Sequence, residues 1–154
     1  FDESGGLRVT LPSGVLFDSG SAELRPASYP LLRDVSELLG ELPELFIEVR
    51  GHSDNRPVGN KSGYADNYEL SYWRADAVAR RISDEGDIPL QQFEVVACGD
   101  GQPIATNETP EGRAANRRVE LHVRGMLDRS EVQDLREEFE ALPQDVAAPA
   151  PGAS

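Results

Sequence analysis

The pattern of apolar and polar positions predicts two amphipathic helices separated by short extended segments. In the first helix, apolar residues recur at helical spacing: Leu31, Val35, Leu38 and Leu42. Ser28 is the expected N-cap, Pro30 is tolerated in a first turn, and Pro43 ends the pattern. The second helix is predicted to run from Asn67 to Asp84, with Gly86 as its natural stop.

Four strands are predicted: three from the alternation of apolar and polar residues that is typical of a half-buried strand, and the one at 93–98 from an apolar run. They cover residues 7–11, 45–50, 93–98 and 119–123. Residues 15–17 are expected to continue the first strand in extended form. Thr109 as N-cap, with Pro110 at the first helical position, predicts a short helix through Ala115. The order β-α-β-α-β-β, with this short helix before the last strand, favours an α/β fold built as a two-layer sandwich.

The character of the chain changes after Gly125. Apolar residues at helical spacing, Val132, Leu135, Phe139 and Leu142, predict an amphipathic helix with a dense acidic face within residues 126–142. This helix either packs against its own domain or pairs with a partner helix. Residues 143–154 are rich in Pro and Ala and are expected to be disordered. The predicted organisation is therefore a domain at 1–125, an acidic helix and a tail.

Composition narrows the class of protein. A length of 154 residues suits one domain with a real core. The net charge of −13 argues against nucleic acid, whose phosphates require a basic surface. The sequence contains no run of 18 or more apolar residues, the length that a helix needs to span a bilayer. Cys98, the only cysteine, excludes an internal disulfide and is expected to be a small buried residue. Because the chain starts at Phe1, we expect it to be part of a longer protein.

Two opposite charges stand at the junctions of predicted elements. Asp54 follows the end of the strand at 45–50, and Arg74 lies on the first turns of the second helix, at the margin of its buried face. An arginine can grip a carboxylate with two parallel hydrogen bonds. The pair could therefore bind the ammonium and carboxylate of a zwitterionic ligand, or it could form an internal salt bridge. Spacing alone leaves both alternatives open.

Other chemistry finds weaker support in the sequence. The polar loop at 55–66 is long for its position, and such loops are usually functional or mobile. His52 and His122 are the only histidines, too few for a zinc site, so no metal or cofactor is expected. His52 is expected to anchor a loop by a hydrogen bond. A triad of Ser53 or Ser71 with His52 and Asp54 would have poor geometry. The many acidic residues leave a glycosidase-like carboxylate pair open by number alone, but no enzyme is expected.

Several motifs occur together in a recognisable order. Gly51-His52-Ser53-Asp54, the run from Asn67 to Ser71, and Arg74-Ala75 resemble the signature of the OmpA/MotB/Pal C-terminal domain family. The resemblance continues at residues 17–24, 99–103 and 112–120, and covers about residues 7–124 in order. Ser53 stands where Thr is commoner, which keeps the hydroxyl, and Gly101-Gln102 stands where Gly-Glu is usual.

The resemblance implies a β-α-β-α-β sandwich that binds peptidoglycan noncovalently in the periplasm. Members of this family recognise the free end of diaminopimelate in the stem peptide, which carries an ammonium and a carboxylate. Carried over residue by residue, the key acid falls on Asp54 and the key arginine on Arg74. Supporting contacts fall on Asn67, Leu70, Ser71, Asp18 and Arg117.

Within the family, Asn55-Arg56-Pro57-Val58 and residues 107–113 look most like MotB, the flagellar stator anchor. That resemblance implies a homodimer, and a MotA-like membrane partner reached through an N-terminal segment that would anchor the protein in the inner membrane. OmpA/Pal-type or secretion-system tethers of the envelope are the alternative. Two further hypotheses remain. The protein is an enzyme that acts on the cell wall, or it is a domain that dimerises through the apolar stripe from Val132 to Leu142.

Overall fold

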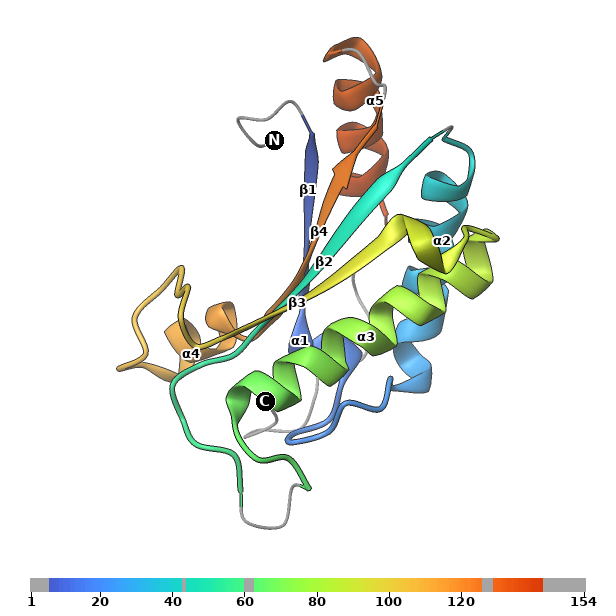
Figure 1. Cartoon of the computed structure of the whole chain (residues 1–154). Coiled ribbons are helices and arrows are strands. Elements are labelled where there is room, and N and C mark those ends of the chain that lie inside the picture. The colour runs from blue at the N-terminus through green and yellow to red at the C-terminus, as the bar shows by residue number, and fades with distance from the viewer. Residues whose placement is uncertain (1–5, 43, 60–62, 126–128, 143–154) are drawn as a thin grey trace.

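In the computed structural model, which describes residues 6–42, 44–59, 63–125 and 129–142, four strands form one mixed sheet (Figure 1). The strands are β1 (Leu7–Pro12), β2 (Phe46–His52), β3 (Phe93–Gly99) and β4 (Arg118–Arg124). Their order across the sheet is β1-β4-β2-β3. β4 runs antiparallel to both β1 and β2, whereas β2 and β3 are parallel. All four predicted strands are confirmed.

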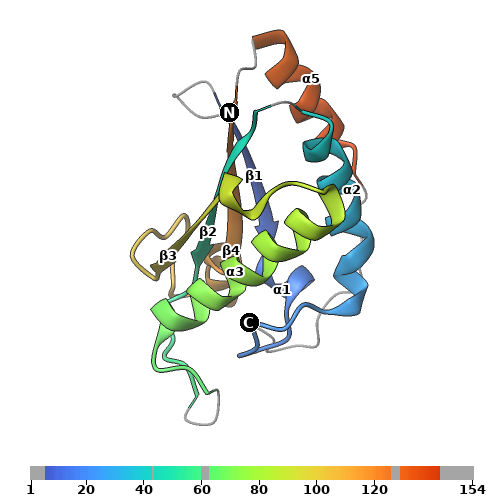
Figure 2. The same cartoon turned by 45° about the vertical axis from the view of Figure 1, so that its right-hand side comes forward.

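Two long helices, α2 (Tyr29–Gly40) and α3 (Asn67–Gly86), cover one face of the sheet (Figures 1 and 2). The core lies between these layers, because alternate side chains of each strand point to the same face. Fully buried core residues include Ile47, Val49, Leu121, Val78 and Ile82. The two-layer α/β sandwich predicted from the sequence is confirmed.

The start of the chain departs from the prediction. Residues 15 and 16 do not extend β1, because Ser13–Leu16 form a single helical turn, α1. Phe17 is extended as expected, but it forms an isolated antiparallel bridge with Leu24. The backbone of α1 is held at both ends: the Ser13 amide donates to the Arg117 carbonyl, and the Phe17 amide donates to the Ser13 carbonyl. The turn buries Leu16 and Phe17 completely. Successive residues of a strand point to opposite faces, so an extended chain would have exposed one of them.

The helix ends also differ in detail. Ser28 precedes α2 at the end of a short 3-10 turn (η1, Pro26–Ser28), but its hydroxyl donates to the Arg25 carbonyl and does not cap the helix. Gly86 is the last residue of α3, and Asp87 takes the left-handed conformation with φ 53°. The predicted stop at Gly86 is therefore confirmed to within one residue, and Gly86 is also needed for packing, since a Cβ there would lie 2.7 Å from the Ser36 carbonyl oxygen of α2.

The remaining elements follow the sequence closely. A 3-10 turn, η2 (Leu90–Gln92), leads into β3, where Cys98 is buried as expected. α4 (Pro110–Asn116) is the predicted short helix, and the Thr109 hydroxyl accepts a hydrogen bond from the Gly112 amide. None of the helices in the described ranges is long and apolar enough to cross a membrane.

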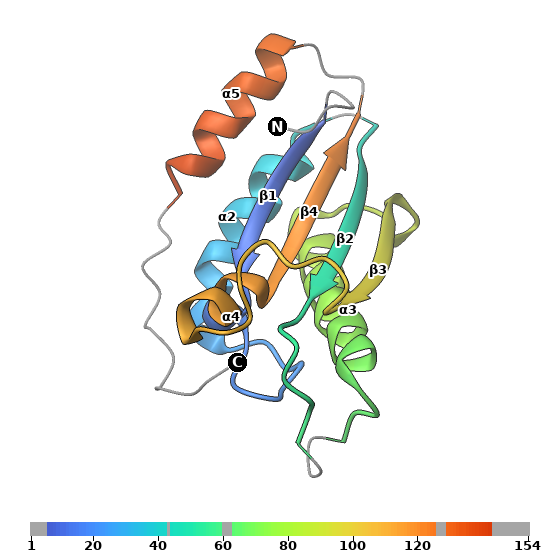
Figure 3. The same cartoon turned by 90° about the vertical axis from the view of Figure 1, so that its left-hand side faces the viewer.

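The C-terminal helix α5 (Arg129–Glu140) belongs to the same hydrophobic core. Val132, Leu135 and Phe139 are buried in it, and α5 lies beside α2 and the β1 edge of the sheet (Figure 3). Of the two alternatives, packing against its own domain is therefore confirmed, and these three side chains of the stripe are covered within the chain. The tail at 143–154 lies outside the described residues.

Strand β2 and helix α3 come into direct contact at Gly51. A Cβ on this residue would lie only 2.0 Å from the Ser71 carbonyl oxygen, far inside van der Waals contact. The Ser71 hydroxyl also accepts a hydrogen bond of 3.1 Å from the Gly99 amide at the end of β3. Gly51 and Ser71 thus join α3 to the two parallel strands at one point.

We predict that Gly51→Ala destabilises the domain by about 3 kcal/mol, because the added methyl group must displace backbone. Chemical denaturation measures the change in the free energy of unfolding. Gly59→Ala is the matched control, since a Cβ there meets no atom within 4 Å and should change stability by less than about 0.5 kcal/mol. Equal stability of the two variants would contradict the contact.

Candidate ligand-binding site

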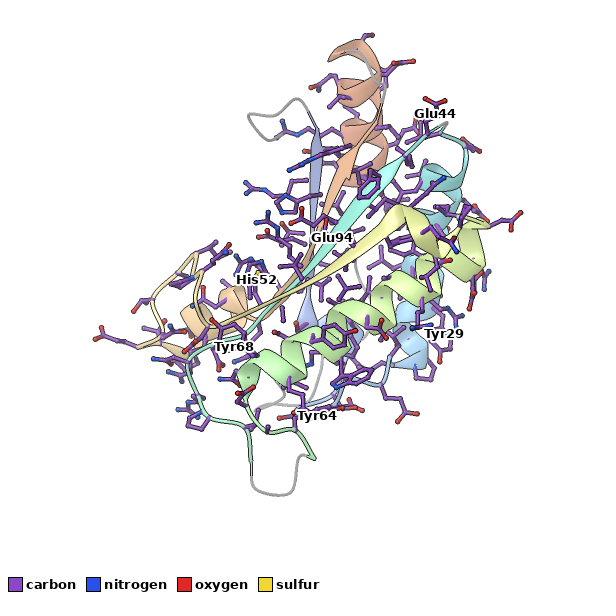
Figure 4. The ribbon with its side chains drawn as sticks, in the orientation of Figure 1. Tyr29, Glu44, His52, Tyr64, Tyr68 and Glu94 are labelled. Carbon is purple, nitrogen blue, oxygen red and sulfur yellow. The ribbon has the colours of Figure 1, made fainter. Side chains whose placement is uncertain are left out.

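A pocket of about 330 Å³ opens where β2 ends and where α3 and α4 begin. In Figure 4, His52 marks the end of β2 and Tyr64 and Tyr68 mark the entrance to α3. Four parts of the chain line the pocket: Ser19 and Gly20, the segment after β2, the pocket-facing side of α3, and α4 with Arg117. The charged lining residues are Asp54, Arg56, Arg74, Arg113 and Arg117.

Asp54 is 6% exposed, and each of its carboxylate oxygens accepts a hydrogen bond. Oδ1 accepts from the Arg56 amide at 3.0 Å, and Oδ2 forms an ion pair of 2.7 Å with Arg117 Nη1. Asp54 is therefore held by its own loop and by the residue that follows α4. The arginine bound to Asp54 is Arg117, whereas the spacing of the sequence had drawn attention to Arg74.

Arg74 is more deeply buried than its place at the margin of the helix suggested, with an exposure of 3%. Its Nε donates to the Ser21 carbonyl at 2.8 Å and its Nη2 to the Asp18 carbonyl at 3.2 Å. The guanidinium lies 5.1 Å from the centre of the Phe17 ring, within the range of a cation–π contact. Burial, and then the nearby charge of Arg117, lower the pKa of Arg74 to about 10, so it stays charged at neutral pH.

The supporting residues expected from the family resemblance divide into two groups. Asn67 and Leu70 line the pocket together with Arg74. The Asn67 amide nitrogen donates to the carbonyls of Asp54 and Arg56, and so fixes the loop that presents Asp54. Ser71 and Asp18 are not among the lining residues.

Ser71 and Asp18 contribute to the framework of the site. The Ser71 hydroxyl bridges α3 and β3, as described above. Asp18 offers its backbone carbonyl to Arg74, whereas its carboxylate is exposed and lies 3.6 Å from Arg25 Nε. Both residues position other groups of the site through these bonds.

Two arginines of the pocket were missed among the sequence-based site residues. Arg56 follows Asp54 by two positions and is exposed, and Arg113 lies in α4 with its Nη1 bonded to the Asn107 carbonyl. Arg113 and Arg117 are four residues apart, a spacing that brings side chains to the same side of a helix. That spacing was the available signal.

A second buried cluster of polar side chains lies on the face of the sheet that points away from the core and from helices α2 and α3. Glu120 accepts a hydrogen bond of 2.7 Å from Arg118 Nε and lies 2.9 Å from His122 Nε2. His52 Nε2 lies 3.5 Å from the same carboxylate, which belongs to strand β4, and the expected role of His52 as a loop anchor stays a prediction. Burial raises the pKa of Glu120, but its contacts with His52, His122 and Arg118 lower it far more.

The comparison with known families identifies the chain. The model of the OmpA family matches residues 16–117. The chain therefore belongs to the OmpA family, as the motifs indicated.

Curated relatives match most of this chain. Motility protein B of Bacillus subtilis is 35% identical over 130 residues, which cover 83% of this chain and 49% of that protein. Peptidoglycan-binding protein ArfA of Mycobacterium tuberculosis is 37% identical over 109 residues, 71% of this chain and 32% of the relative. The chain thus spans about half the length of these relatives or less.

Solved structures share the fold. The periplasmic domain of Helicobacter pylori MotB matches with a TM-score of 0.72 and 28% identity, over 90% of this chain and 88% of the other. The cell wall anchor of the T6SS from Pseudomonas aeruginosa matches with a TM-score of 0.71 and 37% identity, over 77% and 80%. The resemblance to a MotB-type OmpA domain is confirmed by these matches.

We predict that Glu120→Gln destabilises the domain by about 3 kcal/mol at pH 7, because it leaves Arg118 buried without its counter-charge. Since the folded state lowers the pKa of Glu120, its contribution is present above the pKa of unfolded glutamate, about 4.3, and declines below it. The stability difference between the two proteins should therefore shrink below pH 4. Denaturation at several pH values measures this, and a difference that is independent of pH would contradict it.

Proposed function

We propose that this domain binds peptidoglycan by holding the free, zwitterionic end of diaminopimelate between Asp54 and Arg74. The observation that carries the proposal is that a buried acid and a buried arginine line the same pocket in a chain of the OmpA family. A relative named as peptidoglycan-binding, ArfA, and a structure named as a cell wall anchor support the same ligand.

Asp54 is suited to accept an ammonium group. A carboxylate has about four lone-pair sites, and the hydrogen bonds from the Arg56 amide and Arg117 occupy one site on each oxygen. Further acceptor sites thus remain on a carboxylate that is held rigidly at the wall of the pocket. An ammonium that donates to Asp54 would share the carboxylate with Arg117 without having to displace it.

Arg74 is suited to bind the carboxylate of the same ligand. Its burial disfavours the charged form, which is why its pKa is lowered to about 10. A carboxylate placed beside the guanidinium would offset this cost through charge-assisted hydrogen bonds in a partly dehydrated site. Leu70, between Asn67 and Arg74 on the pocket side of α3, offers apolar surface for the methylene groups of the ligand.

Binding fits this pocket better than hydrolysis. Glycoside hydrolysis ordinarily needs two carboxyl groups that flank the scissile bond. Of the described residues that line the pocket, Asp54 alone carries a carboxylate, and that carboxylate is paired with Arg117. We therefore infer that the domain holds the polymer without cleaving it.

We further propose that the domain tethers a membrane machine, a flagellar stator of the MotB type, to the cell wall in the periplasm. The similarity to Motility protein B and to the MotB periplasmic domain supports this role. In this proposal the full protein forms a homodimer and reaches a MotA-like membrane partner through an N-terminal segment. A tether of another kind is the alternative, supported by the likeness to the secretion-system anchor.

We predict that Asp54→Asn and Arg74→Gln each weaken binding of a diaminopimelate-containing muropeptide at least tenfold, since each removes one charge of the clamp. Calorimetric titration measures the affinity, and thermal unfolding shows whether each variant is folded. Asp76→Asn and Arg80→Gln are matched controls, because this ion pair lies on the same helix outside the pocket. Unchanged affinity in both pocket variants would reject the clamp.

The stator role predicts a specific phenotype in the source bacterium. Chromosomal Asp54→Asn should abolish flagellar motility while the protein is still made and the cell envelope stays intact. Swimming assays, immunoblots and leakage of periplasmic proteins measure the three properties. Normal motility together with a leaking envelope would point to the alternative tether.

A further inference from the structure

We propose that Arg56 and Arg113 bind a second carboxylate of the stem peptide, so that the site selects peptides whose carboxylates are free over peptides in which one is amidated. This inference rests on the proposed binding of peptidoglycan and adds a determinant of specificity to it. It assigns a task to the two arginines that the Asp54–Arg74 clamp does not use.

The charge balance of the pocket is the first argument. Four arginines and one aspartate line it, although the chain as a whole carries a net charge of −13. A zwitterion adds one positive and one negative charge and leaves the excess of positive charge uncompensated. Because like charges that line one pocket repel each other, the pocket favours a ligand with more carboxylates than ammonium groups.

The contacts of the arginines provide the second argument. Arg117 forms an ion pair with Asp54. The guanidinium of Arg74 is held by hydrogen bonds that it donates to the carbonyls of Asp18 and Ser21. Arg56 and Arg113 reach the pocket from two other elements, the loop after β2 and helix α4. The backbone of Arg56 is fixed because its amide donates to Asp54 and its carbonyl accepts from Asn67. One Nη of Arg113 is bonded to the Asn107 carbonyl, which orients its guanidinium.

The chemistry of the ligand supplies the matching groups. In a stem tripeptide, the zwitterionic end of diaminopimelate contributes one ammonium and one carboxylate. Two further carboxylates exist, one on the glutamate that precedes diaminopimelate and one at the C-terminus of the peptide. Conversion of either of these two carboxylates to an amide removes a negative charge but changes the shape of the peptide very little. Amidation therefore tests charge recognition with little change in size.

The test is a calorimetric titration of the 154-residue chain with three synthetic stem tripeptides: unmodified, amidated at the glutamate α-carboxylate, and amidated at the C-terminus. We expect at least one of the amidated peptides to bind about tenfold more weakly than the unmodified one, because a charge-assisted hydrogen bond is lost. Equal affinity for all three would overturn the inference and leave the proposed function standing. No binding of any peptide would overturn the proposed function itself.

Variants of the arginines identify the residues responsible. Arg56→Gln, at an exposed position, should bind the unmodified peptide about tenfold more weakly and bind the sensitive amidated peptide as the parent chain does. Arg113→Gln should behave in the same way, with thermal unfolding as a check, since its bond to the Asn107 carbonyl is lost. Arg80→Gln, which removes the same charge outside the pocket, should keep the full discrimination. Full discrimination retained in a folded Arg56→Gln and a folded Arg113→Gln would overturn the assignment.

Discussion

Gly51 of β2 lies against the Ser71 carbonyl of α3, and the geometry of the pocket depends on this contact. Any side chain at residue 51 would have to push the helix away from the sheet, since even a Cβ would lie 2.0 Å from the carbonyl oxygen. Asp54 follows Gly51 by three residues, and Arg74 follows Ser71 by three. The contact between strand and helix therefore fixes the two halves of the proposed clamp relative to each other. Asn67 reinforces it by holding the loop that carries Asp54.

The electrostatics of the pocket follow from burial as much as from charge. Arg74 is held charged in a place that disfavours charge, next to a second arginine, and its pKa falls to about 10 in consequence. A site of this kind is costly to the folded protein unless an anion binds there. The chain as a whole carries a net charge of −13, whereas four arginines and one aspartate line the pocket. This contrast favours a specific anionic group over general adhesion to an anionic polymer.

The sequence predicted the parts of the fold that depend on periodicity. The alternating residues of β2 and β4 and the helical stripes of α2, α3 and α5 each have one face buried in the common core, so their patterns are strong. It failed at residues 15 and 16, because the tertiary bond from the Ser13 amide to the Arg117 carbonyl helps to hold a helical turn there. It failed at Ser28, because the serine hydroxyl donates to the Arg25 carbonyl and does not cap the helix. The predicted stop at Gly86 is confirmed, since α3 ends at this residue.

The candidate site was predictable only in part, because local patterns reveal single residues but not the contacts between distant ones. Asp54 and Arg74 could be chosen because they stand at the junctions of regular elements, and the family motifs pointed to both. The pairing of Asp54 with Arg117 joins residues 63 positions apart, and no local pattern reveals it. The four-residue spacing of Arg113 and Arg117 was a weak signal for Arg113, whereas Arg56 acquires significance only when the loop after β2 and helix α4 meet at one pocket.

The central claim is that one ligand bridges Asp54 and Arg74, and a crystal structure of the domain with a diaminopimelate-containing stem peptide tests it most directly. The account predicts the free ammonium within hydrogen-bonding distance of the Asp54 carboxylate, and the adjacent carboxylate on the Arg74 guanidinium. The loop after β2 should stay in place, because Asn67 already holds it. A peptide bound elsewhere on the domain, or one in the pocket with its ammonium directed away from Asp54, would contradict the account.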